Sequence, residues 1–264
     1  MKNNSEQPTI LVIKKVVQET ESIKTYTFEY KLGAQSGQFV MLWIPRVDQK
    51  PISISRQTDS SFDLTVFKIG KATNAMFAMK EGDKVGISGP YGRGFEIKPK
   101  TNIVLVGGGC GSAPLRMVGE EAEKAGCKVT FITGAKTGKD VLFKDALPDT
   151  CITTDDGSEG FKGFTTQKLE EVLADNKDTD KVYTCGPEVM MKGVVEVCGK
   201  HKVPCEISME RYMKCGFGIC GQCAVDPLGI CICQDGPVFS GEMAAKITEF
   251  GQYHRDKAGV KHEL

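Results

Sequence analysis

The sequence predicts an antiparallel β-barrel, followed by an α/β domain with a parallel sheet and by a small cysteine-rich C-terminal domain. Three observations predict this order. Residues 1–98 contain short strands of alternating polarity that glycine and proline interrupt. Residues 99–204 alternate apolar strands with helices. Residues 205–264 begin with one more strand and then become rich in glycine and cysteine, so this part needs a metal or a partner surface to hold it together.

The barrel prediction comes from side chains that alternate along the chain. In residues 25–30 aromatic side chains alternate with threonine and glutamate, and residues 62–66 repeat the pattern with Phe62, Leu64 and Val66. Alternation places successive side chains on opposite faces of a strand. Residues 38–44 are apolar on both faces. One helix is expected at residues 73–79.

The α/β prediction starts at an apolar stretch that runs into three glycines. Strands of a parallel sheet are buried on both faces and therefore read as apolar runs. Strands that alternate with helices form such a sheet, with helices on both faces. Pro114 fits the first turn of the first helix, where a missing N–H costs little. The expected strands are 103–106, 128–133, 151–154, 181–184 and 206–209, and the expected helices are 113–125, a short one near 141–146, 166–174 and 188–200.

The overall composition excludes several classes of protein. Thirty-four basic residues balance thirty-four acidic ones, so no long-range field favours nucleic acid or an anionic membrane. No stretch approaches the roughly 18 apolar residues of a membrane span. Residues 1–7 are polar and lack the apolar core of a signal peptide. We therefore expect a cytoplasmic protein that binds neither nucleic acid nor membrane.

The eleven cysteines are unevenly distributed, and the distribution predicts a metal site. Six are scattered, whereas five lie between Cys215 and Cys233. Disulfide scaffolds are usually short and secreted, and clustered cysteines in a reducing compartment usually bind metal or carry out redox chemistry. Cys215, Cys220 and Cys223 have the spacing C-x4-C-x2-C, which together with a fourth cysteine matches the plant-type two-iron, two-sulfur (2Fe-2S) cluster.

Glycines between these cysteines support the iron–sulfur interpretation. Gly216, Gly218 and Gly221 lack a Cβ, so the backbone can curl around inorganic sulfur and aim N–H groups at it. A zinc site also takes four thiolates, but it usually presents two similar short cysteine pairs. The fourth ligand is Cys233 or Cys231. We favour Cys233, because the turn that follows it would anchor a ligand at the end of the loop.

Three loops at strand ends predict a nucleotide site. Gly107-Gly108-Gly109 connects a buried strand to a helix, where a phosphate meets helix N–H groups and the positive end of the dipole; a tight turn without a ligand is the alternative. Cys185-Gly186-Pro187 and Asp155 also follow strands. Ligands of such sheets lie at the carboxyl ends of the strands, so the loops together predict one crevice. Cys185 alone could be a small buried residue.

Two stretches of the expected barrel indicate a cofactor site because both precede a nucleotide domain in the chain. Lys50-Pro51-Ile52-Ser53 joins two strands, and Ile69-Gly70-Lys71-Ala72-Thr73 leads into the expected helix, where Thr73 could cap the helix or donate to a phosphate. Each stretch alone is an ordinary strand or turn. The chemistry also calls for a flavin: nicotinamide delivers two electrons as hydride, a two-iron cluster accepts one at a time, and a flavin can do both.

Taken in order, these motifs resemble the ferredoxin–NADP reductase superfamily, and within it most closely the electron-transfer subunits of NAD-dependent, B-type dihydroorotate dehydrogenases. The resemblance covers nearly the whole chain, and the combination of motifs is specific although no single motif is. The matching residues are Pro51-Ile52-Ser53-Ile54, residues 89–95, Gly107-Gly108-Gly109, Ala113-Pro114-Leu115, Asp155-Asp156-Gly157-Ser158, Cys185-Gly186-Pro187 with Met190, and the cysteine loop with Asp235-Gly236-Pro237-Val238-Phe239.

The resemblance implies an FAD-binding barrel at residues 1–98, an NAD-binding domain at 99–204 and a 2Fe-2S cluster domain at 205–264. It implies a partner, the FMN-containing catalytic subunit that oxidises dihydroorotate to orotate in pyrimidine biosynthesis, in a heterotetramer with two copies of each subunit. Electrons would pass from FMN through the cluster and FAD to NAD, giving NADH.

The resemblance also implies roles for individual residues. Lys50, Pro51, Ile52 and Ser53 would lie near the flavin ring. The family often has arginine where this chain has Lys50, and lysine offers a point charge in place of a bidentate fork. The remaining assignments are Ile69, Gly70, Ala72 and Thr73 near the flavin pyrophosphate, Gly107, Gly108, Gly109, Asp155, Gly186 and Pro187 at NAD, Cys185 as the catalytic residue at the nicotinamide, and Cys215, Cys220, Cys223 and Cys233 at the cluster.

Two other functions stay open from the sequence. The small subunit of an electron-bifurcating ferredoxin:NADP oxidoreductase complex would show nearly the same motifs. A zinc-stabilised binding module on an inactive reductase fold would have similar cysteines but no colour. The choice between NAD and NADP is also open, because Lys136 could meet a 2′-phosphate or simply face solvent.

Overall fold

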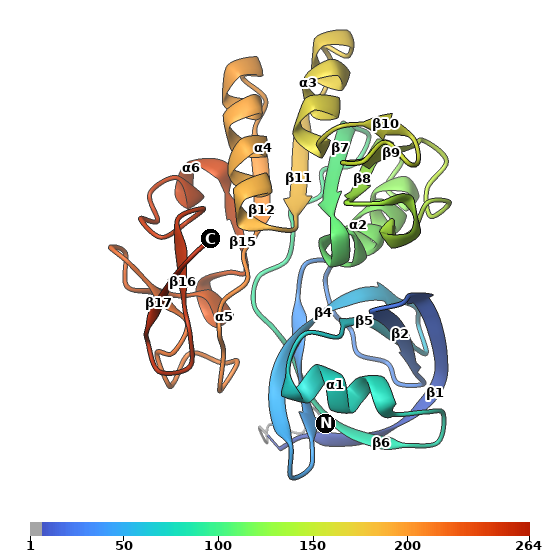
Figure 1. The fold of residues 1–264 in the computed structure, drawn as a ribbon, viewed down its shortest axis with the longest axis vertical. Coiled ribbons are helices and arrows are strands. Elements are labelled where there is room, and N and C mark those ends of the chain that lie inside the picture. Colours follow the sequence, from blue (N-terminus) through green and yellow to red (C-terminus); the bar gives the residue numbers. More distant parts are fainter. Residues whose placement is uncertain (1–6) are drawn as a thin grey trace.

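The structure is a computed structural model that describes residues 7–264. The first part of the chain folds into a closed antiparallel barrel (Figure 1). Residues 1–6 lie outside the described residues. They form most of the polar N-terminal stretch that lacks the apolar core of a signal peptide. The strands neighbour one another in the order β1-β2-β5-β4-β3-β6, which confirms the predicted barrel. The elements are β1 (Thr9–Thr20), β2 (Ile23–Phe28), β3 (Phe39–Ile44), β4 (Asp48–Gln57), β5 (Phe62–Phe67), α1 (Lys71–Ala78) and β6 (Lys84–Tyr91).

Strand β3 is buried on both faces, and its two faces belong to different cores. Val40 and Leu42 point into the barrel interior, where they pack with residues such as Phe28 and Leu64. Phe39, like Met41, packs on the other side against residues of the C-terminal part of the chain. The apolar character of both faces of residues 38–44 is explained by this double contact.

The middle of the chain forms a parallel sheet of order β10-β9-β8-β7-β11-β12, to which β15 adds an antiparallel edge. The predicted strands and the three long helices are confirmed, with bounds within about two residues of the structure. The elements are β7 (Asn102–Gly108), η1 (Gly109–Gly111), α2 (Ser112–Lys124), β8 (Lys128–Ala135), η2 (Gly138–Asp140), β9 (Thr150–Thr154), β10 (Phe161–Lys162), α3 (Thr165–Asp175), β11 (Lys181–Cys185), α4 (Glu188–His201), β12 (Cys205–Ser208) and β15 (Val238–Ser240).

Helices cover both faces of this sheet, as β7 shows. Ile103 and Leu105 pack on the face of α2, whereas Val104 and Val106 pack on the face of α3 and α4. Figure 1 shows α3 and α4 side by side, with α2 on the other side of the sheet. Helix α2 also packs against β4 of the barrel, and its Met117 enters the barrel core. This helix therefore joins the two domains.

The short helix predicted near residues 141–146 is wrong. The chain forms only a 3₁₀ turn, η2, before that stretch, and residues 141–146 are irregular. Phe143 has a φ of 57°, in the left-handed region that cannot continue a right-handed helix. The apolar side chains of Val141 and Leu142 are buried against the sheet domain instead.

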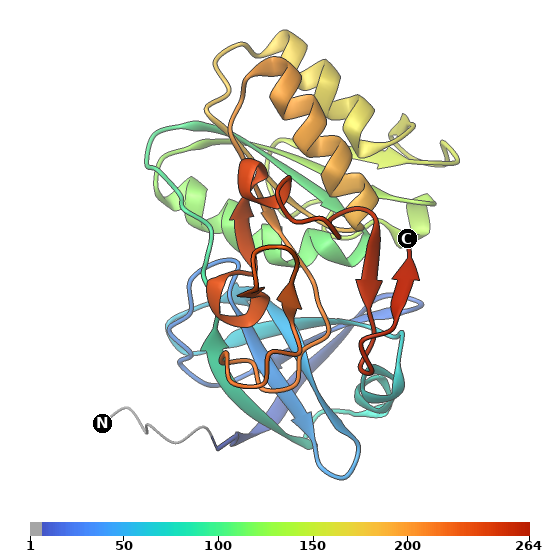
Figure 2. The same ribbon diagram turned by 90° about the vertical axis from the view of Figure 1, so that its left-hand side faces the viewer.

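The C-terminal part of the chain has short elements and lies along both larger domains (Figure 2). The strand β12 belongs to the central sheet, so the sheet continues past the predicted boundary between residues 204 and 205; the division into three domains stays a prediction. No helix within residues 7–264 combines the length and the apolar character that spanning a membrane requires. The elements are β13 (Ala224–Val225), β14 (Ile230–Cys231), α5 (Ile232–Asp235), α6 (Gly241–Ala244), β16 (Tyr253–Arg255) and β17 (Lys261–Glu263).

Candidate functional site

A cleft of about 310 Å³ lies where the barrel, the sheet domain and residues 208–213 meet. Six of the residues predicted to bind flavin line it: Lys50, Pro51, Ile52, Ser53, Ile69 and Thr73. Gly70 is the N-cap of α1 and Ala72 is buried within that helix; neither of these two residues lines the cleft. Further lining residues are Cys110 of η1, Ala113 and Pro114 at the start of α2, and residues 208–213.

Lys50 connects the two walls of the cleft. Its Nζ forms an ion pair with Asp48 (3.0 Å), donates a hydrogen bond to the hydroxyl of Tyr212 (3.2 Å) and lies 4.4 Å from the centre of the Tyr212 ring. Burial lowers the pKa of Lys50, but Asp48 and Tyr212 outweigh burial and raise it above the ordinary value. Lys50 therefore stays a cation at the edge of the cleft.

The hydroxyl of Thr73 organises the loop before α1. Its oxygen accepts hydrogen bonds from the backbone N–H of Ile69 (3.0 Å) and of Gly70 (2.9 Å), and it donates to the carbonyl of Gly70 (3.2 Å). Donation to a phosphate would require the hydroxyl to give up the last of these bonds. The first-turn N–H groups of α1 are oriented as an anion site in any case.

Glu210 is a residue of the cleft that the sequence prediction missed. Its side chain is exposed because it faces the open cleft, yet protein surrounds the carboxyl group on its other sides. Burial, with a contribution from the nearby Glu188 carboxylate, raises the pKa of Glu210. Cys110 lies close by, and burial together with Glu210 raises the pKa of its thiol to about 12. The thiol of Cys110 therefore favours its neutral form.

The two predicted nucleotide loops lie against each other. Strands β7 and β11 are neighbours, with Gly107 opposite Cys185. A Cβ on Gly108 would lie 2.5 Å from Sδ of Met190 and 2.9 Å from Cδ of Pro187, and a Cβ on Gly111 would collide with the carbonyl of Cys185. Glycine is therefore required for this close approach, and two of the three loops predicted to form a crevice lie together at one edge of the sheet.

Cys185 and Asp155 occupy different positions at this edge. Cys185 is almost fully buried, and burial, with a smaller effect of Glu210, raises the pKa of its thiol well above the ordinary value. A thiol with a raised pKa is a poor nucleophile. Asp155 follows β9, two strands away from β7, and is exposed.

The cysteine loop has the backbone that the glycines predict. Gly216, Gly218 and Gly221 all have positive φ (88°, 85° and 66°). Burial raises the pKa of Cys215, but N–H groups of the loop, that of Cys220 first, outweigh this and lower it to about 6. Such N–H groups stabilise sulfur in its anionic form.

Two of the candidate ligands, Cys223 and Cys233, are in direct contact. The N–H of Gly218 donates to Sγ of Cys233 (3.2 Å), and the N–H of Cys233 donates to Sγ of Cys223 (3.4 Å). Within residues 7–264, no three ligand-type side chains are gathered into a preformed metal site. The chemistry of the donors nevertheless fits a cluster, because sulfur atoms and N–H groups face one another in a loop whose glycines allow the turn.

Cys231 has a different environment from Cys233. It pairs with Ala224 in the two-stranded ladder of β13 and β14, and its N–H donates to Asp235 (2.8 Å). Burial and the proximity of Cys223 raise the pKa of its thiol. Cys233 is buried with Cys223 in the core of this part of the chain, and we keep it as the predicted fourth ligand.

Comparisons with known proteins agree with this arrangement. The family described as the iron-sulfur cluster binding domain of dihydroorotate dehydrogenase B matches residues 210–244, and the oxidoreductase NAD-binding domain family matches residues 105–196. The probable dihydroorotate dehydrogenase B (NAD(+)), electron transfer subunit of Methanocaldococcus jannaschii is 47% identical over 260 residues, which cover 97% of this chain and 98% of that protein. This chain belongs to the dihydroorotate dehydrogenase B electron transfer subunit family.

Other relatives support the same family and fold. The protein of the same description from Methanothermobacter thermautotrophicus is 42% identical over 262 residues, 96% of either chain. A solved NADH-dependent reduced ferredoxin–NADP oxidoreductase, described for flavin-based electron bifurcation, superposes with a TM-score of 0.80 and 28% identity, over 94% of this chain and 91% of that one. The fold of this electron transfer subunit family member is therefore ferredoxin reductase-like.

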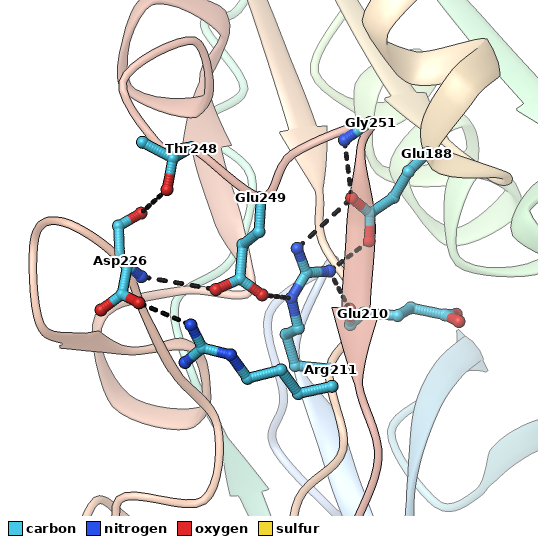
Figure 3. A network of polar contacts seen from close by, with 8 residues as sticks. Glu188, Glu210, Arg211, Asp226, Thr248, Glu249 and Gly251 are labelled. Atoms are coloured by element: carbon cyan, nitrogen blue, oxygen red, sulfur yellow. Dashed lines mark hydrogen bonds and ion pairs between the residues drawn. The ribbon is translucent and has the colours of Figure 1, made fainter. Parts of the chain in front are cut away.

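A buried ion-pair network joins the nucleotide loop to the C-terminal part of this family member (Figure 3). Arg211 donates through Nε to Glu249 (3.0 Å) and through its terminal nitrogens to Glu188, the first residue of α4. The backbone N–H of Gly251 also donates to Glu188 (3.0 Å). The side chains of Arg211 and Glu249 are only 3% and 1% exposed, so each charge depends on its partners.

The network continues toward the cysteine loop. The other oxygen of Glu249 accepts from the N–H of Asp226 (3.4 Å), which lies between Cys223 and Cys233. Arg211 follows Glu210, whose carboxyl group points away from the guanidinium (Figure 3) and which lines the cleft. The sequence prediction missed this arginine. A charged pair enclosed by apolar residues directly after a buried strand was the signal that could have revealed it.

Proposed function

We propose that this chain is the electron transfer subunit of an NAD-dependent dihydroorotate dehydrogenase. FAD occupies the cleft, a 2Fe-2S cluster is held by Cys215, Cys220, Cys223 and Cys233, and NAD binds at the edge formed by β7 and β11. One observation supports this most directly: the flavin cleft, the glycine-rich strand edge and the cysteine loop lie next to one another. Relatives along nearly the whole chain are named as electron transfer subunits.

The residues of the cleft fit a flavin. Pro51 and Ile52 offer apolar contact beside the polar Ser53, and Lys50 adds a positive charge that suits a phosphate-bearing ligand. When bound, FAD supplies the ability to take two electrons as a hydride and release them one at a time. Glu210, whose pKa is raised by burial and by the nearby Glu188 carboxylate, places a carboxyl group at the wall of the cleft.

The residues of the strand edge fit a dinucleotide. Gly108 brings the backbone close to Pro187 and Met190, and the N-terminus of α2 follows, where N–H groups favour the pyrophosphate. We assign Gly107, Gly108, Gly109, Gly186 and Pro187 to NAD contacts, with Asp155 toward the far end of the ligand. Cys185, whose raised pKa favours the neutral thiol, would contribute that thiol to the nicotinamide part of the site.

The partner that this function requires is a catalytic subunit that holds FMN and oxidises dihydroorotate. We propose a heterotetramer with two copies of each subunit. We also propose a cytoplasmic location, supported by all eleven cysteines, which lie in the described residues and are free thiols, as expected in a reducing compartment.

Purification without oxygen tests the proposal. The protein should be coloured and contain FAD and two iron atoms per chain. After mixing with the catalytic subunit, it should reduce NAD when dihydroorotate is added. Zinc in place of iron, without a yellow chromophore, would contradict the proposal and favour a zinc-stabilised module. Reduction of nucleotide by reduced ferredoxin but not by dihydroorotate would favour the ferredoxin:NADP complex.

A further inference from the structure

Three aromatic rings connect the flavin cleft with the cysteine loop. Phe39 lines the cleft and stands opposite Tyr91 across the β3–β6 ladder, with ring centres 6.0 Å apart. The ring of Tyr91 lies 6.1 Å from that of Phe217, between Cys215 and Cys220. Both separations fall within the range of aromatic pairs in contact. Tyr91 is thus the central ring of a continuous path from the cleft to the loop.

The backbone of the cysteine loop rests on the same surface. A Cβ on Gly216 would lie 2.6 Å from Cγ of Met41 and 3.2 Å from Cδ2 of Tyr91. Gly216 also has a positive φ of 88°, so glycine is required both for the turn and for the close approach. The loop is therefore seated directly against β3 and the end of β6.

A second contact fixes the other end of the loop to the segment that directly follows β6. The N–H of Arg93 donates to the carbonyl of Gly236 (2.6 Å), and a Cβ on Gly92 would lie 2.6 Å from Cδ of Pro237. These residues directly follow Tyr91 in the chain, and Gly236 follows Cys233 by only three positions. Tyr91 therefore lies between the two points at which the barrel holds the loop.

The space around the path is densely packed. Phe39 and Met41 are 2% and 0% exposed, and they share one apolar core with Cys223 and Cys233. Tyr91 packs against this core from its edge. Protein interiors are packed like organic crystals, and an electron crosses packed atoms more readily than a gap or a water-filled channel.

We propose that Tyr91 is a positioning residue for electron transfer between the cleft and the cluster. Its ring fills the space between Phe39 and Phe217 and seats the cysteine loop at a fixed distance from the cleft. This inference rests on the proposed function. When NADH drives the reaction, which is the reverse of the proposed path from FMN, reduced FAD would pass one electron at a time to the oxidised cluster; no bond to Tyr91 forms or breaks, and the tyrosine ring is neither oxidised nor reduced.

The test compares three variants of the anaerobic, fully loaded protein. Tyr91→Leu removes the ring but keeps an apolar side chain, Tyr91→Phe restores the ring, and Tyr30→Leu removes an aromatic side chain that is 40% exposed on the barrel. Rapid mixing with NADH separates bleaching of the flavin from reduction of the cluster. Hydrogen exchange of the loop amides at residues 215–221 is measured on the resting protein, so this readout does not depend on turnover.

Tyr91→Leu should bleach its flavin at the wild-type rate but reduce its cluster several-fold more slowly, and its loop amides should exchange faster. Tyr91→Phe and Tyr30→Leu should match the wild type in both readouts. Wild-type cluster reduction and wild-type exchange in Tyr91→Leu would overturn the proposal.

Phe217→Leu approaches the same contact from the loop and gives a second measurement that does not depend on how Tyr91→Leu folds. It should show the same selective slowing of cluster reduction, and a wild-type rate in this variant overturns the proposal. Failure of the proposed function looks different, because the wild-type protein itself would then lack flavin or iron, or would not be reduced by NADH.

Discussion

The barrel and the sheet domain differ from the C-terminal part of the chain in what holds them together. The barrel buries large apolar side chains such as Tyr26, Phe28 and Leu64 inside a closed hydrogen-bonded ladder. The C-terminal part has strands of only two or three residues, and its interior contains cysteines and the charged side chains of Arg211 and Glu249. Burial of apolar surface can stabilise the barrel and the sheet domain without help from a metal or a partner.

This difference shows which parts depend on other groups. A small segment with little apolar core usually needs a metal or a partner. Here the cysteine loop is seated on the barrel, and the ion pairs of Arg211 attach the segment to α4. The C-terminal part should therefore respond to loss of metal or charge, whereas the barrel and sheet should respond to loss of packing.

Loss of a cluster ligand should have the largest effect and should separate the two regions. In Cys223→Ser we expect loss of iron and opening of the C-terminal part, because a structural metal contributes its binding free energy to folding. The barrel should keep its flavin. Iron analysis, visible spectra and limited proteolysis would measure this. Cys220→Ser should behave alike, and wild-type iron in both variants would contradict the ligand assignment.

Cys231→Ser is the matched control for the fourth ligand. If Cys233 holds iron, Cys231→Ser keeps the cluster and Cys233→Ser loses it. The reverse pattern of iron contents would assign the role to Cys231.

Breaking the buried ion pairs should rank second. Arg211→Met leaves the carboxylates of Glu188 and Glu249 without their partner, which typically costs about 3–5 kcal/mol. Hydrogen exchange should locate the loss in the C-terminal part and the start of α4. Arg255→Met is the control, because the side chains of its ion pair with Asp226 are 29% and 60% exposed; such pairs contribute about 0–1 kcal/mol. Equal losses of unfolding free energy in Arg211→Met and Arg255→Met would contradict the prediction.

A packing defect in the sheet domain should come next and leave the iron in place. Leu115 of α2 is fully buried, and Leu115→Ala should lower the free energy of unfolding by about 2–5 kcal/mol through lost burial and a cavity. Leu228→Ala, at a partly exposed position of the C-terminal part, should change it by less than about 0.5 kcal/mol. Denaturant unfolding measures the change in the free energy of unfolding for both variants. Loss of iron from Leu115→Ala would show that packing in the sheet domain also controls the C-terminal part.

The smallest effect concerns alkaline pH and the barrel. Burial raises the pKa of Tyr26 from 10.0 to about 12, and its hydroxyl donates to the carbonyl of Met76 (2.8 Å). Between these values the unfolded chain loses the proton and the folded chain keeps it, so stability is full below pH 10 and falls as pH rises toward 12. Melting curves of the barrel in Tyr26→Phe should show a smaller decrease over this range; an unchanged decrease would assign it to other groups.

Sequence patterns predicted the barrel and the sheet well because each pattern is local. The alternation through Phe62, Leu64 and Val66 and the apolar run of β7 depend only on neighbouring residues and on which faces are buried. The strand β15 was missed because its partner β12 lies far away in the sequence. The helix near residues 141–146 was wrong because burial of Val141 and Leu142, with the left-handed Phe143, overrides local propensity.

Sequence motifs predicted some residues of the candidate site. Residues that reach the site only through folding were missed. Lys50, Ser53 and Thr73 were predicted from their motifs and line the cleft. Glu210 and Tyr212 line the same cleft, but they belong to no motif and reach it because the chain crosses from the sheet to the cysteine loop at that point. Contacts between distant segments of this kind cannot be deduced from spacing along the chain.

The pairing of β12 with β15 has a structural consequence for the segment between them. Ser208 and Val238 are register partners, so the chain leaves the sheet and returns to it at the same place. Everything from residue 209 to 237 is an excursion whose two ends are already joined by backbone hydrogen bonds. The base of the cysteine loop is therefore fixed by the sheet itself, and the position of the loop follows from the positions of β12 and β15.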